Sequence, residues 1–166
     1  MTLGSLQPGA GHGVITVGKD AVNAISVGAV VVPDTSTAPD AYKIAPASAT
    51  VLGPFGVCVN KAAAAADTAF AMALPGSLVA VKAQGAIEVG KEVQCSASVA
   101  GSVAVFAQST ISASPTQTEV QNARDDRLRV VGRYICHDTG VEMSGKTPAT
   151  AAADGDTIII LLGGLS

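Results

Sequence analysis

The spacing of a nucleotide-binding loop occurs at Gly140–Thr147. This stretch reads GVEMSGKT and matches the pattern G-x-x-x-x-G-K-[ST] at every position. In such a loop the backbone amides surround the phosphates, the lysine meets their charge, the hydroxyl binds magnesium, and a helix begins at the lysine. The pattern therefore raises the hypothesis of a nucleotide-binding enzyme that uses Gly145, Lys146 and Thr147.

The residues after this motif do not fit a phosphate-binding fold. Pro148 follows directly and disfavours the helical conformation that Thr147 would need. Only Ala149–Ala153 remain before the turn residues Asp154-Gly155, so a flanking helix would have little more than one turn. A parallel sheet needs crossovers of about a dozen residues, and the chain after Thr147 has room for one more strand. We therefore favour a glycine-rich surface loop and keep nucleotide binding as an alternative.

Other side chains capable of chemistry do not form a catalytic or metal-binding pattern. His12 lies in a glycine-rich stretch, and His137 beside Cys136 lacks the second pair of ligands that zinc requires. No Gly-x-Ser-x-Gly nucleophile motif occurs. The cysteines Cys58, Cys95 and Cys136 are widely spaced and odd in number, which is typical of buried free thiols. We expect no enzyme activity, no metal and no cofactor.

The composition indicates one domain whose surface is rich in apolar groups. The chain has 166 residues, a net charge of -3, 14% charged and 48% hydrophobic residues, and a mean hydropathy of +0.43. The acidic balance and an aromatic content of 3% argue against nucleic-acid binding. We recognise neither a membrane span nor a signal peptide, and expect a protein made in the cytoplasm with no membrane partner. Other chains are expected to cover part of the apolar surface.

The centre of the chain, Phe70–Cys95, has the pattern of short β-strands. Apolar runs of about five residues are separated by Pro75-Gly76, Gly85 and Gly90-Lys91, which are typical turn residues. In the second half of this stretch apolar and polar side chains alternate, as in a strand buried on one face. We expect consecutive short antiparallel strands here.

Similar patterns occur on both sides of this centre. Further strands are expected at 14–17, 22–32, 51–59, 102–106, 128–136 and 157–162. The last of these reads TIIILL and indicates a strand buried on both faces. The stretch 33–46 is expected to be an exposed connection, interrupted only by Tyr42-Lys43-Ile44.

Helix signals are few. Thr116 and Glu119 have the spacing of a capping box, which favours a short helix at 117–123. The run 61–66 is mostly alanine, the best helix former, but five alanines are too few to form a stable helix alone. The group Arg124-Asp125-Asp126-Arg127 is expected to be a solvated, self-paired turn.

These patterns predict an all-β fold. We expect a compact antiparallel β-barrel or β-sandwich with at most one or two short helices. A flexible amino-terminal arm is expected at 1–13, followed by a single β domain at 14–166 with a polar insertion loop at 107–127.

Several motifs follow one another along residues 29–162. They are Gly56-Val57-Cys58-Val59, an Ala/Asp stretch at 66–72, a Leu-Val-x-Val strand, the turn Ile87–Val93, the strand Val130–Ile135 and the closing Asp154–Ile160. This order resembles the capsid cement, or head decoration, proteins of tailed bacteriophages. The extended arm and the polar insertion are additions to that pattern.

The resemblance implies a structural virion protein with no chemistry to perform. Such a protein is commonly a homotrimer that binds the major capsid protein on the outside of the icosahedral head and strengthens the junctions between capsomers. After synthesis in the host cytoplasm it would be located on the capsid exterior. The apolar arm residues Leu3, Leu6 and Pro8 are candidates for capsid contact, because an arm can add a strand to a sheet edge. A carbohydrate-binding or adhesion module of the virion is an alternative, although the shortage of aromatic residues disfavours it.

Overall fold

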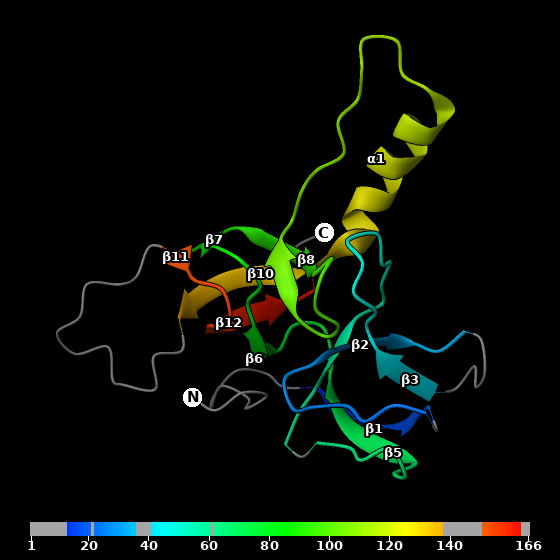
Figure 1. The fold of residues 1–166 in the computed structure, drawn as a ribbon, viewed down its shortest axis with the longest axis vertical. Coiled ribbons are helices and arrows are strands. Elements are labelled where there is room, and N and C mark those ends of the chain that lie inside the picture. The colour runs from blue at the N-terminus through cyan, green and yellow to red at the C-terminus, as the bar shows by residue number, and fades with distance from the viewer. Residues whose placement is uncertain (1–12, 21, 36–40, 61, 138–150, 164–166) are drawn as a thin grey trace, which may run out of the picture.

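The fold combines a closed β-barrel with an open β-sheet (Figure 1). The computed structural model describes residues 13–20, 22–35, 41–60, 62–137 and 151–163. Within these ranges one helix, α1 (Gln117–Arg129), accompanies the strands. The prediction of an all-β fold with at most one or two short helices is confirmed.

Five strands form the barrel. They are β1 (Val14–Lys19), β2 (Val30–Pro33), β3 (Ala41–Ile44), β4 (Gly56–Cys58) and β5 (Ala69–Ala73). Their order is β1-β3-β2-β4-β5, and β5 pairs with β1 to close the ring. The β1–β3 pair is parallel and the others are antiparallel. Closure pairs both edges of each of these short strands.

The second sheet also has five strands. They are β6 (Leu78–Lys82), β8 (Glu92–Cys95), β9 (Val103–Val105), β10 (Val130–His137) and β12 (Thr157–Leu162). The order is β6-β12-β10-β8-β9, with every neighbouring pair antiparallel. Two short strands, β7 (Ile87–Glu88) and β11 (Ala151–Ala152), pair separately. The strand β12, which lies inside the sheet between β6 and β10, is the TIIILL segment, and Ile158, Ile159 and Ile160 are all buried, as the sequence predicts.

Three barrel strands, β2, β4 and β5, form a wall shared by two hydrophobic clusters. Val30, Val57 and Ala73 belong to the larger cluster, which also contains side chains of β6, β8, β10 and β12. The smaller cluster takes the alternate residues of the same strands, Val31, Cys58 and Met72. It also includes side chains of β1 and β3, so it fills the barrel. This shared wall therefore packs the barrel against the sheet.

Consecutive strands of the chain centre do not pair with one another. The strands occur where they are predicted, but β12 and β10 lie between β6 and β8, and β7 pairs with β11. The expectation of consecutive antiparallel strands is therefore wrong in its pairing. The physical reason is that β12, apolar on both faces, is stabilised by a position inside the sheet, and it takes that position between β6 and β10.

The charged group 124–127 is helical, so the prediction of a solvated turn is wrong. The helix α1 begins at the predicted capping box but continues past Ala123 to Arg129. No glycine or proline interrupts the chain between Thr116 and Gly132, and most residues of α1 are good helix formers. The strand predicted at 128–136 consequently begins two residues later, at Val130.

One further expectation, that of an exposed connection at 33–46, is wrong in part. The interruption Tyr42-Lys43-Ile44 in the predicted exposed connection is a barrel strand, β3, and its first residue, Ala41, is buried. The alanine run at 61–66, which is too short to form a stable helix alone, is not helical where the structure describes it, since Ala63 forms a β-bridge with Ile25. Burial against the barrel outweighs the helix propensity of alanine here.

Replacing Gly132 by alanine is expected to destabilise the protein by about 3 kcal/mol. A Cβ atom at this position would lie 2.3 Å from the carbonyl oxygen of Leu161 in β12. Because that oxygen belongs to the backbone of β12, which is paired with β6 on one edge and β10 on the other, the overlap is relieved only by moving the strand. Urea unfolding followed by circular dichroism measures the effect.

The matched control for this substitution is Gly76→Ala. Gly76 has a φ of +90° and open space where a Cβ atom would lie, so alanine there introduces backbone strain without a clash. We expect a cost of about 1 kcal/mol. A Gly132→Ala protein with the unfolding midpoint of the wild type would contradict the packing described for β10 and β12.

Candidate functional site: a projecting spur and an apolar groove

Many of the residues singled out from the sequence lie outside the described part of the chain. These are the motif Gly140–Thr147, His12 and the arm residues Leu3, Leu6 and Pro8. The surroundings of the motif can still be compared with a phosphate-binding loop. The preceding strand, β10, is antiparallel to both neighbours, and Ala151–Ala152 form the strand β11 where the motif requires a helix. These surroundings differ from those of a nucleotide-binding fold.

The three cysteines, Cys58, Cys95 and Cys136, form no disulfide with one another. The prediction of buried thiols is confirmed for Cys58 and Cys95, whereas Cys136 is half-buried. Burial raises the pKa of Cys58 to about 11 and the pKa of Cys95 to about 12. Because the thiolate is the reactive form, both groups stay protonated and inert at neutral pH. In the part of the chain that the structure describes, no group of three or more His, Cys, Asp or Glu residues is placed to hold a metal ion.

A buried ion pair lies at the end of β1. The Lys19 side chain is fully buried, and its Nζ donates to the carbonyl oxygens of Asp20 and of Ala65, the latter at 3.2 Å. Its distance to Asp20 Oδ1 is 3.8 Å, and Asn23 Nδ2 donates to Asp20 Oδ2 at 3.2 Å. These contacts fasten the end of β1 to the segment at 62–67, so we assign the pair a structural role.

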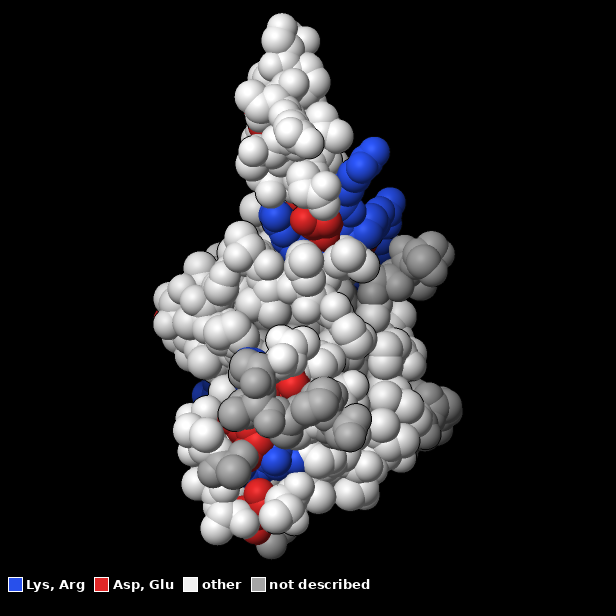
Figure 2. Space-filling view, turned by 90° about the vertical axis from the view of Figure 1, so that its right-hand side faces the viewer, with Lys and Arg blue, Asp and Glu red and all other residues white. Residues whose placement is uncertain are grey.

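A spur, residues 106–129, projects from the sheet (Figures 1 and 2). The chain leaves β9, runs outward as an extended segment, and returns through α1 into β10. The one buried residue of α1 is Asp126. No helix among the described residues is long and apolar enough to cross a bilayer. Since the spur has no apolar core of its own, polar contacts must hold it in shape.

A capping box holds the start of α1. The amide of Glu119 donates to Thr116 Oγ1 at 3.2 Å, and the amide of Thr116 donates to Glu119 Oε2 at 2.6 Å. The hydroxyl of Ser112 also donates to Glu119 Oε2, at 3.1 Å. The predicted pairing of Thr116 with Glu119 is therefore confirmed, and it connects the extended segment to the helix.

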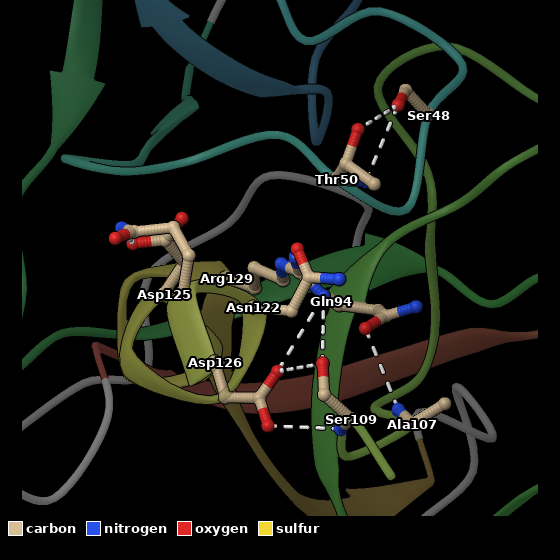
Figure 3. A network of polar contacts seen from close by, with 10 residues as sticks. Ser48, Thr50, Gln94, Ala107, Ser109, Asn122, Asp125, Asp126 and Arg129 are labelled. Carbon is tan, nitrogen blue, oxygen red and sulfur yellow. Dashed lines mark hydrogen bonds and ion pairs between the residues drawn. The ribbon is translucent and has the colours of Figure 1, made fainter. Parts of the chain in front are cut away.

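A second polar network, shown in Figure 3, holds the base of the spur. Asp126 accepts hydrogen bonds from the amide of Ser109 at 2.9 Å and from the Ser109 hydroxyl at 2.8 Å. Arg129 Nη1 lies 3.4 Å from Asp126 Oδ1, and Arg129 Nη2 donates to Asn122 Oδ1 at 3.4 Å. The amide of Ala107 donates to Gln94 Oε1 of β8 at 3.4 Å. The charge-assisted bonds of Asp126 fix the extended segment against α1, and the neutral bond to Gln94 fixes it against the sheet.

An apolar groove of about 430 Å³ lies beside the base of α1. Its lining comes from β2 and the residues just after it, from β3 and from the loop at 46–54. It consists of Val32, Pro33, Thr35, Lys43, Pro46, Ser48, Thr50, Val51, Leu52, Gly53 and Pro54. Leu52 is 41% exposed, and Leu128 at the end of α1 is 53% exposed. The amide of Gly53 donates to the carbonyl of Leu128 at 2.7 Å, which holds the two leucines near each other. The sequence analysis placed Leu128 in a strand, and therefore did not predict that Leu128 lies beside an apolar groove.

No protein-family model, curated protein or solved structure matches this chain.

Replacing Asp126 by alanine is expected to lower the free energy of unfolding by about 2 kcal/mol. The substitution leaves Arg129, whose side chain is 12% exposed, without its carboxylate, and it frees Ser109. Amide hydrogen exchange in residues 107–116 should accelerate more than exchange in the barrel. Asp125→Ala is the control, because Asp125 is in the same helix and bonds to Gln121 on the surface. Equal effects of the two substitutions would refute this role of Asp126.

The start of α1 is expected to fray at acid pH. The amide of Thr116 holds the pKa of the Glu119 carboxyl below its ordinary value, with the hydroxyls of Thr116 and Ser112 contributing. A lowered folded-state pKa gives stability that is present above the ordinary pKa and lost as pH falls through the lower value. The amide NMR signals of Thr116 and Glu119 should therefore shift together below the ordinary glutamate pKa. Glu119→Gln should abolish this transition, and a midpoint at or above the ordinary pKa would be inconsistent with the capping box.

Proposed function

We propose that this protein is a structural cement protein that binds the outer surface of a tailed-phage head. The observation that carries the proposal is the number of large apolar side chains left in contact with solvent. Their exposed fractions range from 37% to 72%, and they are Val14, Ile15, Val22, Leu52, Val89, Val99, Val105, Ile111, Val120, Leu128 and Ile135. They lie on the barrel, the sheet and the spur. Such a surface is well suited to burial between subunits.

The apolar groove is the surface that we assign to the major capsid protein. Burying an exposed leucine side chain contributes about 1.5–3 kcal/mol, and the groove has one leucine on its rim and another beside it. A contribution of this size in each copy adds up over the many equivalent sites of an icosahedral shell. The mechanism is therefore mechanical, and the proposed protein is not an enzyme and needs no cofactor.

The order of sequence motifs also supports this proposal, because it resembles that of phage head decoration proteins. On that basis we propose a homotrimer, located on the capsid exterior, with no nucleic-acid or membrane partner. The arm residues Leu3, Leu6 and Pro8 remain candidates for a second capsid contact. Deletion of residues 1–11 tests that contact, and unchanged occupancy of the capsid would reject it.

The purified chain is expected to bind empty heads of the phage that encodes it. Binding should saturate at a fixed number of copies per head and raise the temperature and the chaotrope concentration at which the heads break. A sizing column should report three chains per particle for the free protein. Cosedimentation with heads that leaves their stability unchanged, or no cosedimentation, would overturn the proposal.

Charged substitutions in the groove locate the contact. Leu52→Asp and Leu128→Asp should each reduce head binding at least about tenfold, because a buried unpaired carboxylate is costly. Both residues are exposed in the free protein, so its circular dichroism and unfolding midpoint should not change. Ala100→Asp is the control, since it places the same charge on an exposed turn elsewhere and Ala100 is not one of the large apolar side chains. Equal losses from all three substitutions would point to a general charge effect and not to the groove.

A further inference from the structure

All four arginines of the chain fall between residues 124 and 133. They are Arg124, Arg127, Arg129 and Arg133, and two aspartates accompany them, so this segment carries a net charge of +2. The whole chain carries -3, and the remaining residues therefore carry -5. Figure 2 shows positive side chains gathered at the base of the spur. The sequence analysis interpreted residues 124–127 as a self-paired turn and therefore missed this cluster of arginines.

A pocket of about 330 Å³ opens at this place. We call it the spur-base pocket, and it is lined by Glu92, Phe106, Gln108, Ala123, Asp126, Arg127, Val130 and Arg133. The residues come from β8, the extended segment, α1 and β10. The pocket is therefore built where the spur joins the sheet, and the Asp126 network holds its walls in place.

Two of the arginines have unused hydrogen-bond donors. Arg127 is exposed and has neither a hydrogen bond nor an ion pair with any described residue. Arg133 makes one ion pair among these residues, with Glu92 at 3.9 Å, and its buried Nε has no hydrogen-bond partner there. By contrast, Asp126 is saturated by Ser109 and Arg129. The pocket thus offers two guanidinium groups and few internal acceptors for them.

We propose that the spur-base pocket binds a carboxylate of a partner protein, either a glutamate or aspartate side chain or a chain terminus. Guanidinium groups match the planar carboxylate with paired hydrogen bonds. Phe106 and Val130 supply apolar surface for the methylene groups that carry such a carboxylate. Under the proposed function, on which this assignment rests, the carboxylate belongs to the major capsid protein.

The pocket favours a single negative charge over a phosphate. Glu92 and Asp126 line it as well, and both repel a dianion more strongly than a monoanion. The net charge of -5 on the rest of the chain also opposes the approach of a nucleic-acid backbone. A carboxylate is therefore the anion that the pocket selects.

The test follows the arginine Nε–Hε signals of the full chain by NMR. The probe is the peptide acetyl-Gly-Glu-Glu-Gly-amide, and acetyl-Gly-Gln-Gln-Gly-amide, inorganic phosphate and a short single-stranded oligonucleotide are the comparisons. We expect saturable shifts of the Arg127 and Arg133 signals with the glutamate peptide. Arg127→Gln and Arg133→Gln should each weaken its binding about tenfold. Arg124→Gln, which removes the same charge from α1 outside the pocket lining, should change it less than about twofold.

Three outcomes would overturn the inference. The first is that the glutamine peptide binds as well as the glutamate peptide. The second is that Arg124→Gln weakens binding as much as Arg127→Gln. The third is that phosphate or the oligonucleotide binds more tightly than the glutamate peptide. Head binding then separates this inference from the proposed function. Wild-type protein that binds the peptide but not phage heads would refute the proposed function and leave the carboxylate site standing. Heads that take up wild type and Arg127→Gln equally would refute a capsid carboxylate as the occupant.

Discussion

The wall formed by β2, β4 and β5 is the constraint on which the rest of the structure depends. Its residues point alternately into the barrel and toward the open sheet, and both sides are buried. A strand buried on both faces must be apolar at every position, which explains runs such as Val30-Val31-Val32. Each fully buried valine contributes about 1.5–3 kcal/mol, so the wall stabilises both halves at once. Neither half buries this wall without the other.

The spur shows how a segment without an apolar core keeps a defined shape. It is fastened at its outer part by the capping box and at its base by Asp126, Ser109 and Arg129. A 13-residue helix is marginal in isolation, because its nucleation is costly. The connection to β10, a strand inside the open sheet, anchors the carboxyl end of this helix. The capping box and the Asp126 network then order the extended segment before α1, which the helix alone would not hold in place.

The features of the fold that depend on local sequence could be predicted. Alternation located most strands, TIIILL indicated a doubly buried strand, and the spacing of Thr116 and Glu119 gave the start of α1. The features that depend on distant partners could not. The order β6-β12-β10-β8-β9 depends on which apolar faces meet, and nothing near β6 in the chain indicates that its partner is the last strand. The alanine run shows the same limit, because its bridge to Ile25 is a tertiary contact.

The spur-base pocket could not be predicted from the sequence for a related reason. A cluster of mixed charge is usually solvated, and for that reason the sequence analysis favoured a solvated turn at 124–127. What changes the interpretation is the burial of Asp126, which pairs with Arg129. Among the described residues, Arg133 then pairs with Glu92 alone, and Arg127 pairs with no carboxylate. Burial of one carboxylate is a tertiary property. The concentration of all arginines in one segment was the available signal, since arginine is the residue suited to paired recognition of an anion.

The apolar groove and the spur-base pocket meet at the last turn of α1. Leu128 lies beside the groove and Arg127 lines the pocket, so one helical turn presents an apolar and a charged contact. These contacts respond differently to conditions, because salt screens the charged one and leaves the apolar one nearly unchanged. In the proposed complex, apolar burial would supply most of the affinity, and the arginines would set the orientation of the two proteins. Since Asp126 holds this same turn in place, the rigidity of the spur base governs both contacts together.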